Sequence, residues 1–137
     1  MSEMYCVVRE VRVPAVPYTS PEKPVYKSVE FPEDAVITEV RIEPHLYPLE
    51  TLRLVVSITD QDGTTYYEGY AFSSKDAILE KTLSARDLYS IFGNREKPLR
   101  IRRIEFSAIS NMERTPGYFV IWIMYWTSKP EPFYQLV

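Results

Sequence analysis

Residues 117–126 read GYFVIWIMYW, and every position after the glycine is apolar or aromatic. The run is far shorter than the ~20 residues that a membrane-spanning helix needs, and its content of β-branched and aromatic residues favours a strand. A strand without polar alternation is expected to be buried on both faces. The run therefore predicts a two-layer β fold, and it places both tryptophans of the chain, Trp122 and Trp126, in one strand.

Alternating apolar residues predict further strands on both sides of this run. Period-two patterns occur at residues 5–13, 25–31, 36–43, 52–59, 65–72 and 99–109. They predict an all-β fold, an antiparallel β-sandwich of seven or eight strands with one or two short helical turns. The number and near-even spacing of the strands favour a jelly-roll topology.

Local signals mark the connections between these strands. The Asp-Gly pair in Asp60-Gln61-Asp62-Gly63 is typical of a hairpin turn, and a change of parity at Arg102-Arg103 predicts a β-bulge. Ser84 is the expected N-cap of a short helix that ends at Gly93. The pattern leaves residues 73–83 open between a helix and a strand.

The length of 137 residues is that of one ordinary domain, so residues 1–137 are expected to form a single β-sandwich domain. Four prolines between residues 14 and 24 predict an extended connector in place of a central strand. Residues 128–137 contain a further Pro-Glu-Pro and are expected to form a C-terminal arm. The arm is expected to dock either on its own sheet or on a neighbouring molecule.

Composition restricts the partners and the compartment. The formal net charge is −3, which argues against general affinity for nucleic acid. The charge is uneven, since residues 86–103 carry a net charge of +4 and the rest of the chain −7. The opening Met-Ser-Glu-Met-Tyr resembles no secretory signal, so we expect a cytoplasmic or virion location and no membrane span. Few Asn and Gln beside frequent Glu, Arg and Pro form a bias reported for thermophile proteins.

No catalytic constellation or metal cluster is recognisable, so we expect no enzyme, cofactor or metal. Cys6 and His45 are the only residues of their types, and Cys6 lies in an expected strand, where a small buried thiol is the usual case. Asp60 and Asp62 resemble part of a calcium loop but lack its downstream bidentate Glu, so the turn interpretation is favoured.

Three sets of residues are the candidate sites. Tyrosines on one expected strand would form a stacking platform for sugars if exposed, and one inner face of the sandwich if buried. Arginines near residue 100 would bind phosphate or nucleic acid, or would guard an exposed edge strand. The surplus of aromatic residues near the C-terminal end predicts an interface. The three sets are Tyr66, Tyr67 and Tyr70; Arg100, Arg102 and Arg103; and Trp122, Trp126, Phe133 and Tyr134.

These observations favour a non-enzymatic structural protein that acts through self-association, as a homo-oligomeric virion or filament subunit. The first alternative is a carbohydrate-binding module on a jelly-roll scaffold. The second is an adaptor that binds phosphate or nucleic acid through the arginine-rich strand. Exposure of the tyrosines and the tryptophans is the observation that separates these hypotheses.

Overall fold

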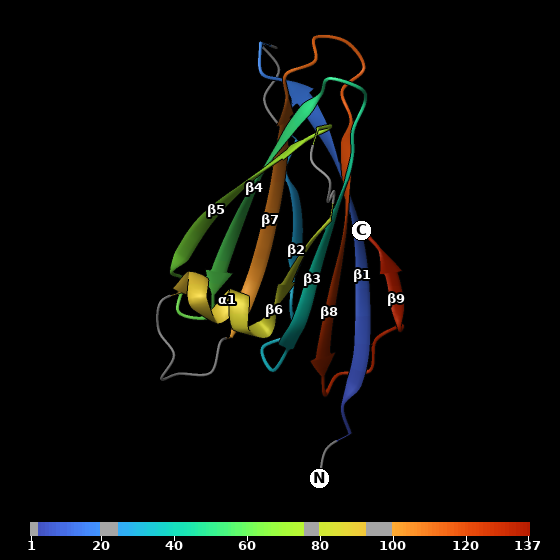
Figure 1. Ribbon diagram of the computed structural model, residues 1–137. Coiled ribbons are helices and arrows are strands. Elements are labelled where there is room, and N and C mark those ends of the chain that lie inside the picture. Colours follow the sequence, from blue (N-terminus) through green and yellow to red (C-terminus); the bar gives the residue numbers. More distant parts are fainter. Residues whose placement is uncertain (1–2, 20–24, 76–79, 93–99) are drawn as a thin grey trace.

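The computed structural model describes residues 3–19, 25–75, 80–92 and 100–137, which form nine strands and one helix (Figure 1). The elements are β1 (Tyr5–Pro17), β2 (Lys27–Glu30), β3 (Val36–His45), β4 (Thr51–Asp60), β5 (Thr65–Ser73), β6 (Lys81–Ser84), α1 (Ala85–Phe92), β7 (Ile101–Ser110), β8 (Tyr118–Thr127) and β9 (Tyr134–Leu136).

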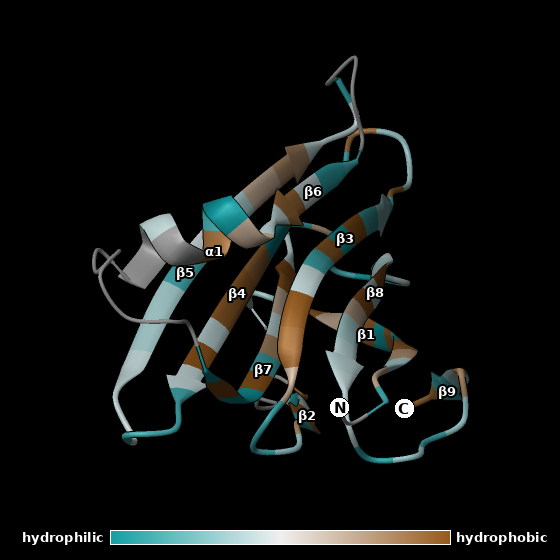
Figure 2. Ribbon diagram, turned by 90° about the horizontal axis from the view of Figure 1, so that it is seen from below, coloured by the Kyte–Doolittle hydropathy of each residue, from teal (hydrophilic) through white to brown (hydrophobic). Residues whose placement is uncertain are grey.

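The strands follow the order β5-β4-β7-β1-β8-β3-β6 in one curled sheet, with β2 added to β7 and β9 added to β1. The first eight strands pair in a nested, antiparallel manner: β1 with β8, β2 with β7, β3 with β6, and β4 with β5. We refer to the half of this sheet formed by β9, β1, β8, β3 and β6 as sheet A, and to the half formed by β2, β7, β4 and β5 as sheet B. α1 lies between β5 and β6 at the two ends of the path (Figures 1 and 2).

The all-β prediction is confirmed, but the sheet is mixed and not purely antiparallel. β1 causes the difference because it is long enough to belong to both sheets. Its residues Tyr5–Pro14 pair with β8, whereas Ala15–Pro17 pair in parallel with β7. The second parallel pairing joins β9 to β1.

The core lies between the inner faces of the two sheets. Alternate residues of β4, from Leu52 to Ile58, are buried against alternate residues of β8, from Phe119 to Tyr125. Phe72 of sheet B meets Phe119 of sheet A edge to face, with ring centroids 5.5 Å apart. Hydrophobic colour runs along β4, β7 and β3 in Figure 2, in agreement with the period-two pattern.

The expected burial of β8 on both faces is only half met. Phe119, Ile121, Ile123 and Tyr125 are fully buried, which makes this side of the strand part of the core. The residues that alternate with them point away from the core, and among these Trp126 is 40% exposed. The second apolar face of β8 therefore lies on the outside of sheet A.

The proline-rich connector predicted over residues 14–24 begins later than expected, because β1 continues to Pro17. A proline lacks only its own backbone N–H, so β1 can continue past Pro14 to Pro17 because the residues next to them make backbone hydrogen bonds. Ala15 N donates to Gly117 O at 3.1 Å, and Tyr18 N donates to Ser110 O at 3.0 Å. Residues 20–24 of the connector lie outside the described residues.

The local signals for turn, bulge and helix start are confirmed. Asp60 Oδ1 accepts backbone hydrogen bonds from Asp62 and Thr64, and Gly63 has a φ of 88°. The register between β4 and β7 shifts at Thr59/Asp60, where Arg102 is the extra, bulged residue. Ser84 Oγ accepts from Asp87 N at 3.2 Å as the N-cap of α1. The predicted helix end at Gly93 lies outside the described residues. Residues 73–83, which the sequence pattern left open between a helix and a strand, contain most of the strand β6.

Candidate functional site

The outer side of sheet A carries a column of apolar side chains, which we call the tryptophan face. Its members project outward from β8, in the middle of the sheet: Tyr118, Val120, Trp122, Met124 and Trp126. Directly cross-strand residues share a face of a sheet, so the register identifies their neighbours. Met124 lies between Val8 and Glu39, and Trp126 lies between Cys6 and Val36.

Charged residues border the tryptophan face on both sides. On β3, Arg41 Nε lies 3.2 Å from Glu80 Oε1. On β1, Arg12 Nε lies 3.3 Å from Glu10 Oε2. A shallow hollow of about 250 Å³ lies between the borders, over Trp122 and Met124. At the far end of the column, His45 stacks on Tyr118 with ring centroids 4.5 Å apart.

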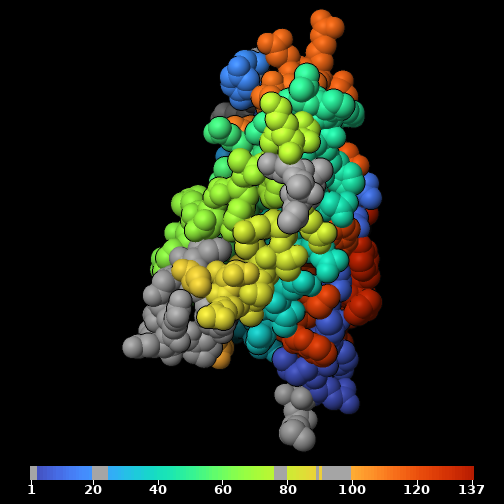
Figure 3. All heavy atoms as spheres, in the orientation of Figure 1, coloured from blue at the N-terminus to red at the C-terminus, as the bar shows by residue number. Residues whose placement is uncertain are grey.

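The C-terminal arm borders the same face, because β9 extends sheet A beside β1. Figure 3 shows the red C-terminal residues against the blue N-terminal strand. Val8 N donates to Phe133 O at 2.7 Å, and Val137 N donates to Glu10 O at 2.8 Å. The arm therefore docks on its own sheet, which was one of the two alternatives.

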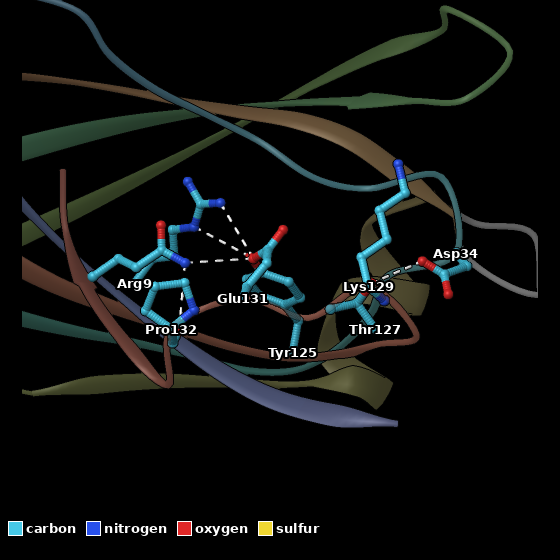
Figure 4. A network of polar contacts seen from close by, with 8 residues as sticks. Arg9, Asp34, Tyr125, Thr127, Lys129, Glu131 and Pro132 are labelled. Carbon is cyan, nitrogen blue, oxygen red and sulfur yellow. Dashed lines mark hydrogen bonds and ion pairs between the residues drawn. The ribbon is translucent and has the colours of Figure 1, made fainter. Parts of the chain in front are cut away.

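A buried tyrosine fixes the start of this arm (Figure 4). The hydroxyl of Tyr125 donates to Glu131 and accepts from Arg9 Nε at 3.2 Å. Burial and the Glu131 carboxylate raise the pKa of Tyr125 to about 12. A second contact lies nearby, where Asp34 accepts from Thr127 Oγ1 and Ser128 N, each at 2.8 Å. Hydrogen bonds from Ser128, and then from Thr127, lower the pKa of Asp34 to about 2.

This arrangement brings two of the four residues predicted as an interface, Trp122 and Tyr134, into direct contact. Trp122 Nε1 donates to Tyr134 Oη at 3.2 Å, and Tyr134 donates to Glu10. The hydrogen bond to Glu10 raises the pKa of Tyr134. Trp126 lies on the outward face of β8, and Phe133, which directly precedes β9, is 65% exposed.

The three predicted tyrosines do not form one platform, because adjacent strand residues point to opposite faces. Tyr66 and Tyr70 pair with the buried Ile58 and Leu54, so they face the inner side and are half-buried. Tyr70 packs against the core, and burial raises its pKa. Tyr67 points outward and is 72% exposed.

Tyr67 instead belongs to a groove on the outer side of sheet B, which we call the tyrosine groove. One hollow of about 350 Å³ lies between Tyr67 and Tyr26. A second, of about 460 Å³, adjoins it and is bordered by Tyr18. Both hollows include Arg53 and Ile109. Sequence reasoning missed Tyr18 and Tyr26, because only the pairing of distant strands places them near Tyr67.

The three predicted arginines do not form one basic cluster. Arg100 and Arg102 are exposed, and Arg100 O accepts from Gln61 N at 3.0 Å. Arg103 is half-buried, with its Nε 3.6 Å from Glu105 Oε1. Its cross-strand partner on β2 is Glu30. These acids oppose the basic surface that the sequence indicated, and phosphate binding here stays a prediction.

Cys6 was expected to be a buried thiol, but it is half-buried and lies on the outward face of β1. The only histidine that could act as its base is His45. Cys6 pairs with Trp126 and His45 with Tyr118, at the two ends of β8. Eight residues of strand separate these ends by about 27 Å. The structure does not bring the thiol and the imidazole together.

One buried carboxylate was not singled out from the sequence. Glu50 is 0% exposed and accepts hydrogen bonds from Tyr47 N at 3.0 Å, Gly117 N at 2.8 Å and Ser110 Oγ at 2.5 Å. A Cβ on Gly117 would lie 2.1 Å from His45 O and 2.6 Å from Glu50 Oε1. Glu50 therefore joins the β3–β4 loop to the ends of β7 and β8. A single Glu in a loop carries no sequence signal of such a role.

Comparison with known proteins gives little further information. No family model matches the chain, and no curated protein matches it. Among solved structures it is similar to the VP2 subviral particle of infectious bursal disease virus, with 10% sequence identity and a TM-score of 0.37. The match covers 90% of this chain and 37% of the VP2 chain. A TM-score of this size defines neither the fold nor the function of this chain. In the described part of the chain, no helix is long and apolar enough to cross a membrane.

Proposed function

We propose that this protein is a non-enzymatic structural subunit that self-associates through the tryptophan face. The observation that carries the proposal is the outer side of β8, where Trp122, Met124 and Trp126 reach solvent from the centre of a sheet. Removing apolar surface from water is worth about 25 cal/mol per Å². Trp and Met are also enriched at the centres of protein interfaces.

The size of the face is that of an ordinary interface. The three long strands β1, β8 and β3 are about 14 Å wide at ~4.8 Å per strand, and the outward column runs about 27 Å along them from Tyr118 to Trp126. With the short strands β6 and β9 at the borders, the plan area is roughly 500 Å². Protruding side chains enlarge the accessible area toward the ~800 Å² per partner of a stable complex.

The charges around the face fit a second copy of the same chain. The border carries both signs, with Arg12 beside Glu10 on one side and Arg41 among Glu39, Glu43 and Glu80 on the other. In a two-fold interface the same patch meets itself, so it must contain both a charge and its complement. This border satisfies that condition, whereas a strongly charged partner would leave one sign unpaired.

The fold proposed for this role is a jelly roll. The nested pairing of β1–β8 yields two four-stranded sets, β1-β8-β3-β6 and β2-β7-β4-β5. A long antiparallel hairpin rolled into two facing sheets is the jelly-roll arrangement. In this proposal β9 and the parallel end of β1 are additions to that scaffold.

A virion shell or a filament would need a second contact, because a two-fold interface closes on itself. β5 is the strand proposed for such a contact, because it forms the edge of sheet B and contains no proline. Its one charged residue, Glu68, faces the inner side, and α1 packs beside the strand. Both features limit pairing at an edge, so this contact is the weaker of the two.

Sedimentation velocity on matched variants tests the proposal. Trp126→Glu places a carboxylate on the tryptophan face and is expected to shift the wild-type oligomer to monomer. Tyr67→Glu places the same charge on an exposed tyrosine of the other sheet and is expected to leave the oligomer intact. Circular dichroism and thermal unfolding establish that both variants fold. A wild-type oligomer unchanged by Trp126→Glu would contradict the proposed interface.

A further inference from the structure

We propose that the tyrosine groove on sheet B binds a neutral oligosaccharide. This inference does not depend on self-association, because the groove and the tryptophan face lie on different sheets. The two hollows adjoin at Arg53 and Ile109 and together run from Tyr18 to Tyr67. A continuous groove of this kind suits a chain of sugar residues better than a single small ligand.

The walls of the groove are exposed aromatic rings. Tyr67 is 72% exposed and Tyr26 is 64% exposed, on opposite sides of β4 and β7. Their backbones are about three strand spacings apart, or roughly 14 Å, which leaves room for a ring between the side chains. Tyrosine offers an apolar face for stacking and a hydroxyl for a hydrogen bond, and the apolar faces and hydroxyls of a sugar match both.

A row of residues that crosses the floor of the groove ends at a glycine on the edge strand β5. Gly69 pairs with Val55, which pairs in turn with Ser107, so the three form one outward row across the sheet. A Cβ on Gly69 would meet no atom within 4 Å, and its φ lies outside the left-handed region. Nothing in the described chain therefore requires glycine in this strand. A glycine inside a strand often marks a place where a ligand approaches closely.

The polar groups of the groove favour a neutral ligand over an anion. Arg53 has no ion-pair partner within the described ranges. Glu105, on the same side of the sheet, carries the opposite charge and lies 3.6 Å from Arg103 Nε. A guanidinium and a carboxylate together can donate to and accept from sugar hydroxyls. The lining of the two hollows carries one guanidinium and one carboxylate, so it has no excess of positive charge that would favour a phosphate or sulfate group.

A glycan array probed with labelled protein tests this site, followed by calorimetric titration of the best free oligosaccharide. We expect neutral glycans to bind. Tyr67→Ala and Gly69→Val are each expected to weaken binding at least tenfold, the first by removing a wall and the second by placing a branched side chain beside Tyr67 at the edge of the groove. Glu68→Gln is the matched control, because it lies between these residues but faces the inner side, and its affinity should equal that of the wild type.

The thermal midpoint separates loss of the site from loss of the fold. Gly69→Val has room for its side chain and should unfold at a temperature no lower than the wild type, so weaker binding by this variant reports on the groove. Failure to bind any neutral glycan would overturn the proposal, as would full affinity in both groove variants. Selective, salt-sensitive binding of sulfated or phosphorylated glycans would replace it with an anion site. A changed oligomeric state in Tyr67→Ala would replace it with a protein interface.

Discussion

Replacing Glu50 by Ala is predicted to be among the most damaging single substitutions in this protein. Its carboxylate accepts three hydrogen bonds and is fully buried. The truncation leaves Gly117 N–H without a partner in a buried position, which costs about 2 kcal/mol. Tyr47 N–H lies nearer to water and the Ser110 hydroxyl can rotate, so the loss of each of these two hydrogen bonds adds about 1 kcal/mol. The expected loss in the free energy of unfolding is therefore about 4 kcal/mol.

Urea denaturation followed by tryptophan fluorescence measures this loss. For a chain of this length, 4 kcal/mol corresponds to a fall of roughly 12–16 °C in the thermal midpoint. Glu50→Gln keeps the volume and one acceptor oxygen, and it should lose about half as much. Glu33→Ala removes an exposed carboxylate and is the control, with a change below about 0.5 kcal/mol. A Glu50→Ala protein within 1 kcal/mol of the wild type would refute the role assigned to this carboxylate.

Two further predictions concern the contacts around the C-terminal arm. The pKa of Asp34 is about 2 when folded and about 3.9 when unfolded, so Asp34 stabilises the fold above pH 4 and this contribution disappears as the pH falls toward 2. Asp34→Asn should therefore flatten the acid limb of a stability–pH profile, and an unchanged limb would contradict the assignment. Tyr125→Phe removes the hydroxyl that joins Arg9 and Glu131, and it should lower stability by about 1–2 kcal/mol and speed amide exchange in residues 131–137. Wild-type exchange rates there would show that Tyr125 does not hold the arm.

The sequence predicted the features that depend on neighbouring residues. Alternation defined the core face of β4, Asp60 and Gly63 indicated the turn, and the parity change at Arg102 indicated the bulge. Each of these signals acts over a few residues, and each is enforced by backbone geometry. The N-cap at Ser84 belongs to the same class.

Features that depend on distant strands were not predictable in this way. The strand character of Pro14–Pro17 requires hydrogen bonds to the segments around Ser110 and Gly117. The tyrosine groove requires that β5, β4 and β7 lie side by side. Glu50 gains its role only when three chain segments converge on it. In each case the residues involved are far apart in the sequence, and only the folded chain brings them together.

The most direct test of self-association uses the two tryptophans, because Trp122 and Trp126 are the only ones in the chain and both lie on the tryptophan face. Their emission and acrylamide quenching should be measured against protein concentration, with the mass followed by light scattering. The proposed interface predicts that the emission shifts to shorter wavelength and that quenching falls as the mass rises above 16.1 kDa, all along one curve. A monomeric mass at every concentration, or a mass that rises while the tryptophans remain equally quenched, would contradict it.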